Sequence, residues 1–231
     1  MYRSLNAEHI IHTIEQLRVR IEERFPGSGL GKVAAELQQI CQEAVTRAHW
    51  IARPLLGLRL SIGLLVALIA SIVLLALLNL NVPLKLQSFS EFVQAVEAGV
   101  NDIVFVVIAI FFLITLEGRI KRRRALKAIH ELRALAHIID MHQLTKDPHV
   151  ITNPGQATRS SPKRTMTDFE LSRYLDYCSE MLSLIGKVAA LYVQRFDDPV
   201  ALSAVDQIED LTTGLSGKIW QKIMMINQGR A

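Results

Sequence analysis

The chain has 231 residues, of which 50% are hydrophobic and 21% are charged, and its formal net charge is +4. This balance is too apolar for most soluble proteins and too polar for a transporter with many spans, so it favours a few membrane spans with large polar flanks. The two cysteines, Cys41 and Cys178, form no CxxC motif, which argues against a disulfide framework or a cysteine-ligated metal centre. Only 6% of the residues are aromatic, so helices are expected rather than sheets.

Residues 1–54 are expected to form a pair of cytoplasmic helices. Over residues 7–24, apolar side chains recur at every third or fourth position, as on one face of an amphipathic helix. They are Ile10, Ile14, Leu17 and Ile21. Pro26 and the glycines after it break this helix, and a second helix is expected from about Leu30 to Arg53, where Pro54 ends it.

The first membrane span is expected over residues 55–81. Residues 60–78 contain no charged side chain, and roughly twenty apolar helical residues are enough to cross a hydrocarbon core about 30 Å thick. Gly63, Ala67 and Ser71 recur at every fourth position, so they share a helix face on which another helix can pack closely. Small residues are also common in membrane spans, which is the plainer interpretation of this pattern.

Residues 82–98 are expected to form a short amphipathic loop at the outer membrane surface, with a short amphipathic helix over residues 88–97. Glu91, Glu97 and Asp102 make this region acidic. If the chain forms a ring-shaped oligomer, these carboxylates would form a ring that attracts cations. The plainer interpretation is a solvated loop in which one carboxylate lies at the membrane interface. Asp102 is the strongest candidate, because acidic side chains near lipid are costly and often functional.

The second span is expected over residues 99–120. Its apolar run, residues 103–116, is about 21 Å long as a helix, so it needs flanking residues to complete the crossing. Six of the nine residues 119–127 are basic. They are Arg119, Lys121, Arg122, Arg123, Arg124 and Lys127.

This basic cluster predicts the topology. Basic residues flank the two spans on the side of the chain termini, whereas Lys85 is the only basic residue between the spans. The positive-inside rule therefore places both termini in the cytoplasm. Anionic lipid headgroups are the expected partners of the cluster, and they explain the basic charge without any nucleic acid.

A stalk helix is expected over residues 121–144, because no helix breaker follows the second span until Pro148. The stalk carries His130, His137 and His142. His130 and His137 share a face but are about 10 Å apart along the helix axis, so only neighbouring copies could bring these imidazoles onto one metal ion. Polar positions on a bundle surface are the preferred interpretation, and a pH-sensing role is an alternative.

Residues 145–166 contain three prolines and are expected to be a flexible linker. Residues 167–231 should then form an αα-hairpin, with a capping box at Thr167 and Glu170 and a second helix that starts at Asp198 and Pro199. Apolar residues of its first helix follow a heptad pattern, a seam that predicts contact with a second copy or a partner. The seam comprises Leu171, Leu175, Cys178, Leu182, Ile185, Ala189, Tyr192 and Phe196.

No pattern typical of an enzyme is recognisable. Residues 27–32 are glycine-rich and end in Lys32, but Val33 stands where a phosphate-binding loop needs a hydroxyl group for magnesium. A nucleophile elbow and paired catalytic carboxylates are not recognisable either. We therefore expect no catalytic residue, no cofactor and no resident metal ion.

Together these patterns predict an all-α membrane protein, in which a two-span transmembrane hairpin anchors a cytoplasmic, coiled-coil-like helical bundle. The expected function is a non-enzymatic scaffold or assembly role in the cell inner membrane. The bundle would bind a second copy, as a homo-oligomer, or another membrane-protein subunit. The alternative is a subunit of a homo-oligomeric ion channel or transporter with an acidic outer mouth.

Overall fold

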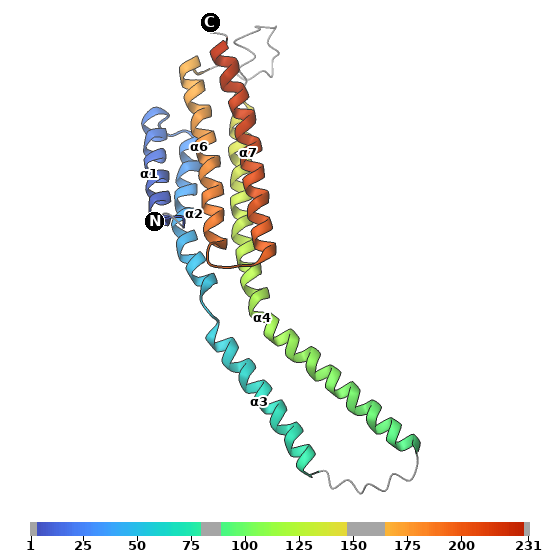
Figure 1. The fold of residues 1–231 in the computed structure, drawn as a ribbon. Coiled ribbons are helices and arrows are strands. Elements are labelled where there is room, and N and C mark those ends of the chain that lie inside the picture. Colours follow the sequence, from blue (N-terminus) through green and yellow to red (C-terminus); the bar gives the residue numbers. More distant parts are fainter. Residues whose placement is uncertain (1–3, 80–88, 147–164, 229–231) are drawn as a thin grey trace. The chain divides into compact units, whose positions relative to one another are not determined.

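The computed structural model describes residues 4–79, 89–146 and 165–228, and in this part of the chain every regular element is a helix. The helices are α1 (Ala7–Arg24), α2 (Gly29–Ala52), α3 (Leu56–Asn79), α4 (Phe89–Leu144), α6 (Asp168–Val193) and α7 (Pro199–Gln228) (Figure 1). The chain divides into two compact units. We call residues 1–52 with 122–231 the bundle unit, and residues 53–121 the apolar unit.

Local signals in the sequence explain where the helices of the bundle unit begin. The side chain of Asn6 caps α1 by accepting hydrogen bonds from the amides of Glu8 and His9. Gly27, in the turn to α2, has a φ of +67°, which residues with side chains rarely adopt. The capping box predicted at the start of α6 is present, because Thr167 and Glu170 each accept a hydrogen bond from the other's backbone amide.

The core of the bundle unit lies between α1, α2, α6, α7 and the C-terminal part of α4. α2 packs on α1 and α6, and α6 packs on α7, as Figure 1 shows. α4 contributes Leu132 and Ile139, both fully buried. Hydrogen bonds tie α4 to its neighbours, from Arg47 of α2 to Glu131 and from Arg133 to Gln207 of α7. Five helical segments therefore share one apolar core.

Both cysteines are buried in this core. Burial raises the pKa of the Cys41 thiol to about 11 and that of the Cys178 thiol to about 12, because a buried thiolate loses its hydration. Each cysteine is therefore a neutral, small apolar side chain at neutral pH.

The predicted seam of α6 is buried by the chain itself, which corrects the expectation that it contacts a second copy or a partner. Seven of its residues, from Leu171 to Tyr192, are at most 7% exposed within the single chain, and Phe196 packs against the same core. The heptad pattern required a partner for this face, and α2, α7 and α1 provide one. No free apolar seam remains on α6 for another molecule.

α4 is one continuous helix of 56 residues. The expected continuation of the second span into the stalk is present, and Gly118 does not interrupt it. The short amphipathic helix expected within the loop 82–98 is present from Phe89, but it is continuous with the second span as part of α4, while residues 82–88 lie outside the described residues. No proline occurs between Phe89 and Leu144, so the helical hydrogen bonds continue through this region. Residues 147–164, and with them the three prolines of the predicted linker, also lie outside the described residues.

The apolar unit contains α3 and the first part of α4. Two stretches, Gly29–Ile72 and Gly99–Leu144, contain a window long and apolar enough to cross a membrane, and no part of either window is buried. Large apolar side chains are open along both helices, and Leu60, Leu64 and Phe105 are 74%, 75% and 71% exposed. These helices therefore have the length and surface of membrane spans.

Candidate functional site: charge pairs at the polar ends of the apolar helices

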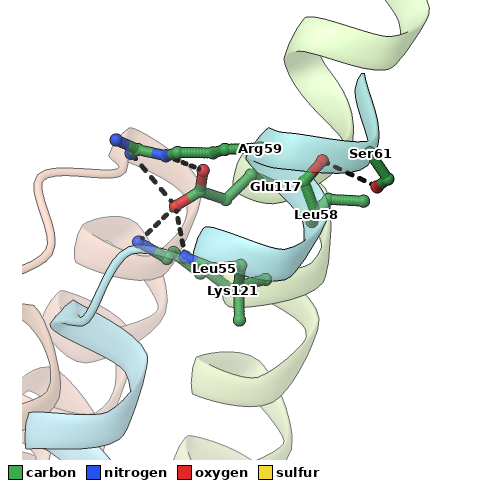
Figure 2. Close-up of polar contacts among 6 residues, drawn as sticks. All are labelled: Leu55, Leu58, Arg59, Ser61, Glu117 and Lys121. Atoms are coloured by element: carbon green, nitrogen blue, oxygen red, sulfur yellow. Dashed lines mark hydrogen bonds and ion pairs between the residues drawn. The ribbon is translucent and has the colours of Figure 1, made fainter. Parts of the chain in front are cut away.

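The carboxylate of Glu117 on α4 is the centre of a charge cluster in the apolar unit (Figure 2). Arg59 of α3 donates from Nε to Glu117 Oε2 at 2.6 Å and from Nη2 to Oε1 at 3.2 Å. Lys121 Nζ lies 2.8 Å from Glu117 Oε1, and the backbone amide of Leu55 donates to the same oxygen at 3.3 Å. We call these four residues the Glu117 clamp.

Helix geometry explains why the clamp forms at this point. Leu55 directly precedes α3, and the first amides of a helix have no partner within the helix. Glu117 accepts one of these hydrogen bonds and places a negative charge at the positive end of the α3 dipole. Lys121 follows Glu117 by four residues, so both side chains lie on one face of α4. Glu117 therefore caps α3 from another helix.

The clamp is partly removed from water. The side chains of Glu117 and Lys121 are 13% and 11% exposed, whereas that of Arg59 is 60% exposed. The Glu117 carboxylate and the Lys121 ammonium are thus both largely shielded from solvent, while Arg59 lies on the solvent-exposed side of the carboxylate. With two cations and one anion, the clamp holds α3 against α4 and leaves one net positive charge. This arrangement is suited to fixing two helices and not to acid–base chemistry.

In the bundle unit, Arg122 pairs with Asp198 at the turn between α6 and α7. Arg122 Nε lies 3.0 and 2.8 Å from the two carboxylate oxygens, and Asp198 Oδ1 also accepts the amides of Val200 and Ala201. Burial on its own raises the pKa of Asp198, but the hydrogen bonds from Arg122, Ala201 and Val200 outweigh it and lower the pKa below the usual value. Asp198 therefore caps α7, as expected, and anchors α4 as well.

The predicted basic cluster is thus divided into paired and unpaired charges. Lys121 is buried against Glu117 and Arg122 binds Asp198, so neither presents a free charge to lipid. Arg119 lies over the ring of Phe112, and Arg124 lies over the ring of Trp50. Arg123 and Lys127 are exposed, without an ion pair among the described residues. The charges open to a lipid headgroup are therefore fewer than the sequence predicted.

The acidic and small residues singled out in the spans are exposed in the single chain. Glu97 and Asp102 are exposed on α4, while the side chain of Glu91 lies outside the described residues. Gly63, Ala67 and Ser71 are also exposed on α3, and a side chain placed at Gly63 would have nothing within 4 Å. Among the described side chains, Glu97 and Asp102 are open to solvent, and so is the small-residue face of α3.

The stalk histidines lie apart from one another. His130 and His137 are exposed, whereas His142 is half-buried, with Nδ1 3.3 Å from the hydroxyl oxygen of Tyr174. A Cβ atom at Gly29 would approach His142 Cε1 to 2.6 Å, so α2 packs directly on this ring. Within the described ranges, no three His, Cys, Asp or Glu side chains are grouped to hold a metal ion.

Comparisons of the chain with protein-family models, with curated proteins and with solved structures gave no match.

Sequence reasoning missed Glu117 and Trp50. Glu117 was visible as the single acidic residue directly after an apolar run, and Lys121 four residues later was a detectable partner. Trp50 near the end of α2 was detectable as an aromatic residue close to a membrane span. Their partners on other helices had no signal in the sequence.

Proposed function

We propose that this protein is a non-enzymatic integral protein of the cell inner membrane. In this proposal α3 and the first part of α4 cross the bilayer as a hairpin, and both chain termini lie in the cytoplasm. The bundle unit is then held at the cytoplasmic surface, where it acts as a platform that binds a partner protein or a second copy.

The single observation that carries this proposal is the exposed apolar surface of α3 and α4. Fully burying one large apolar side chain is worth about 1.5–3 kcal/mol, and both helices leave such side chains open along their length. A helical hairpin with this surface is unfavourable in water and favourable in hydrocarbon. Burial in the lipid hydrocarbon therefore accounts for the exposed apolar side chains of α3 and α4 without a protein partner.

The distribution of charge supports the proposed orientation. Arg47, Arg53 and Arg59 precede or enter α3, and the basic residues 119–127 follow the apolar part of α4. Pairing within the Glu117 clamp makes it less costly to hold Lys121 and Arg59 close to the hydrocarbon edge. This distribution is the one that the positive-inside rule associates with cytoplasmic ends.

The surface of α7 supports the platform role. Trp220 is 60% exposed and Met224 is 44% exposed, and residues four positions apart lie on the same side of a helix. Exposed tryptophan is frequent at the energetic centres of protein interfaces. Because the α6 seam is used inside the chain, this α7 face is the better candidate for contact with a partner.

The experiment that tests the membrane proposal combines extraction with reporter fusions. The protein should stay with membranes in alkaline carbonate, dissolve only in detergent, and place reporters at both termini in the cytoplasm. A chain that dissolves in carbonate, or a terminus that lies outside the cytoplasm, would overturn it.

A subunit of a homo-oligomeric cation channel is the second candidate, favoured by the exposure of Asp102 and of the small-residue face. Glu97 and Asp102 differ by about 140° around α4, so both cannot point toward one central axis. If this candidate holds, liposomes with the purified protein should pass cations, and Asp102→Asn should change the cation selectivity. A folded oligomer without conductance would exclude it.

A further inference from the structure

A hollow of about 290 Å³ lies between α2 and α4 in the bundle unit. Its basic and aromatic walls come from Arg124, Lys127 and Trp50. The remaining lining residues are Arg47, Ile51, Ala128 and Glu131. All of these residues belong to the bundle unit, so the hollow is formed by one compact unit of the chain.

The charge of the hollow is positive. Arg47 is neutralised by ion pairs with Glu43 and Glu131, which leaves Arg124 and Lys127 as uncompensated cations in the lining. They are three residues apart on α4, so they lie on one side of the helix. A ligand that fits this lining carries negative charge.

Arg124, which lines the hollow, carries a hydrogen-bond donor without a partner among the described residues. Its guanidinium carbon lies 3.6 Å from the centre of the Trp50 ring. Its Nη1 atom is buried and has no hydrogen-bond partner among the described residues. A buried donor without a partner is costly, and a small movement of the side chain toward an acceptor oxygen in the hollow would remove that cost. The guanidinium lies over the indole ring, and this cation–π contact holds it beside Trp50.

The position of these residues in the sequence points to the source of the ligand. Trp50 stands two residues before the end of α2, and α3 follows within a few residues. Arg124 and Lys127 follow the apolar run of α4 by about two and three helical turns. Trp, Arg and Lys just outside a membrane span are the residues that contact lipid headgroups.

We propose that this hollow binds the phosphate-bearing headgroup of an anionic phospholipid, with Arg124 and Lys127 on the phosphate and Trp50 beside the glycerol region. This inference rests on the proposed membrane hairpin and names a specific lipid site on it. It goes beyond the basic cluster as a whole, because Arg123 is as basic as its neighbour Arg124 but does not line the hollow.

Tryptophan fluorescence can test the proposal, because the chain has only two tryptophans. In a Trp220→Phe background, Trp50 is the single emitter. The full-length protein in detergent micelles is titrated with phosphatidylglycerol, and with phosphatidylcholine at the same mole fractions. Phosphatidylglycerol should shift the Trp50 emission in a saturable way, and phosphatidylcholine should not.

Matched variants locate the site. Arg124→Gln and Lys127→Gln should each weaken the apparent affinity for phosphatidylglycerol by about five-fold, while Arg123→Gln, which removes the same charge outside the hollow, should leave it unchanged. Equal effects of all three variants would overturn the site. So would saturation by inorganic phosphate, by phosphatidylcholine, or by raised protein concentration without lipid.

Failure of this inference is distinguishable from failure of the proposed function. If the protein resists carbonate extraction but its Trp50 emission responds equally to phosphatidylglycerol and phosphatidylcholine, the headgroup site is excluded and the membrane hairpin is not. If carbonate releases the protein from membranes, the proposed membrane hairpin is excluded as well.

Discussion

Arg122 of α4 and Asp198 at the start of α7 are 76 residues apart in the sequence and meet through both carboxylate oxygens. Asp198 also caps α7 through the amides of Val200 and Ala201, so one carboxylate joins α4 to the start of α7. It is 6% exposed, and it therefore cannot replace these partners with water.

Replacing Asp198 should separate its two roles. Asp198→Ala removes the cap and the partner of Arg122 and should cost about 2 kcal/mol of unfolding free energy. Asp198→Asn keeps a good N-cap and should cost about half as much. Urea unfolding in detergent, followed by circular dichroism, measures both. Equal losses in the two variants would show that the cap contributes nothing.

The stability contributed by Asp198 should depend on pH. Its pKa is lowered in the folded chain, so its stabilisation is fully present above the unfolded pKa of about 4 and is lost as the pH falls through the folded value. The difference in unfolding free energy between the wild type and Asp198→Asn should therefore shrink below about pH 4. A difference that stays constant down to about pH 2 would mean that the folded carboxylate has an ordinary pKa.

Removing the carboxylate of the Glu117 clamp should loosen α3 from α4. Glu117→Gln leaves Lys121 without its anion at a site where that side chain is 11% exposed, and a loss of about 2 kcal/mol is expected. Arg59→Gln should cost less than about 1 kcal/mol, because Arg59 is 60% exposed. Thermal unfolding in detergent compares the two. A larger loss from Arg59→Gln would reverse the assignment of Glu117 and Lys121 as the core of the clamp.

A substitution in the α6 seam should act on folding and not on assembly. Leu182 is fully buried in the chain's own core, so Leu182→Ala should cost about 3 kcal/mol through the cavity it leaves. The oligomeric state in detergent, measured by native mass spectrometry, should be the same as that of the wild type. A changed oligomeric state with an unchanged free energy of unfolding would show that the α6 seam contacts another molecule.

The exposed face of α7 should behave in the opposite way. Trp220→Ala should change the unfolding free energy by less than about 0.5 kcal/mol, since the side chain is mostly in solvent. It should reduce cross-linking of the protein to its partner or to itself in native membranes. Val200→Ala is the matched control, because Val200 is 45% exposed and lies on the opposite side of the same helix, about 200° from Trp220. Unaltered cross-linking in Trp220→Ala would remove this face from the proposed function.

The sequence is a good guide where the determining interaction is local. The first helix has the predicted bounds, and the capping box at Thr167 and the start of α7 at Pro199 are as expected. These features depend on residues within one helical turn of each other. The start of α4 at Phe89 was missed because an amphipathic segment followed by an apolar one can form either two helices or one.

The partners in the candidate site depend on contacts that periodicity cannot supply. Arg59 and Glu117 are 58 residues apart, and nothing in the spacing of either helix pairs them. The seam of α6 illustrates the same limit, because a heptad pattern states that a face is buried and does not name the element that buries it. The all-α class and the two long apolar helices were therefore predictable, while the particular ion pairs required the structure.

The bundle unit is assembled from residues on both sides of the apolar unit, and this has a consequence during synthesis. α1 and α2 leave the ribosome first, but α6, which covers them, is translated only after both apolar helices. Until then Leu37 and Cys41, fully buried in the finished protein, have no cover from that helix. A nascent chain halted just after α4 should thus need a chaperone at its amino-terminal segment, and release of the complete chain should end that need.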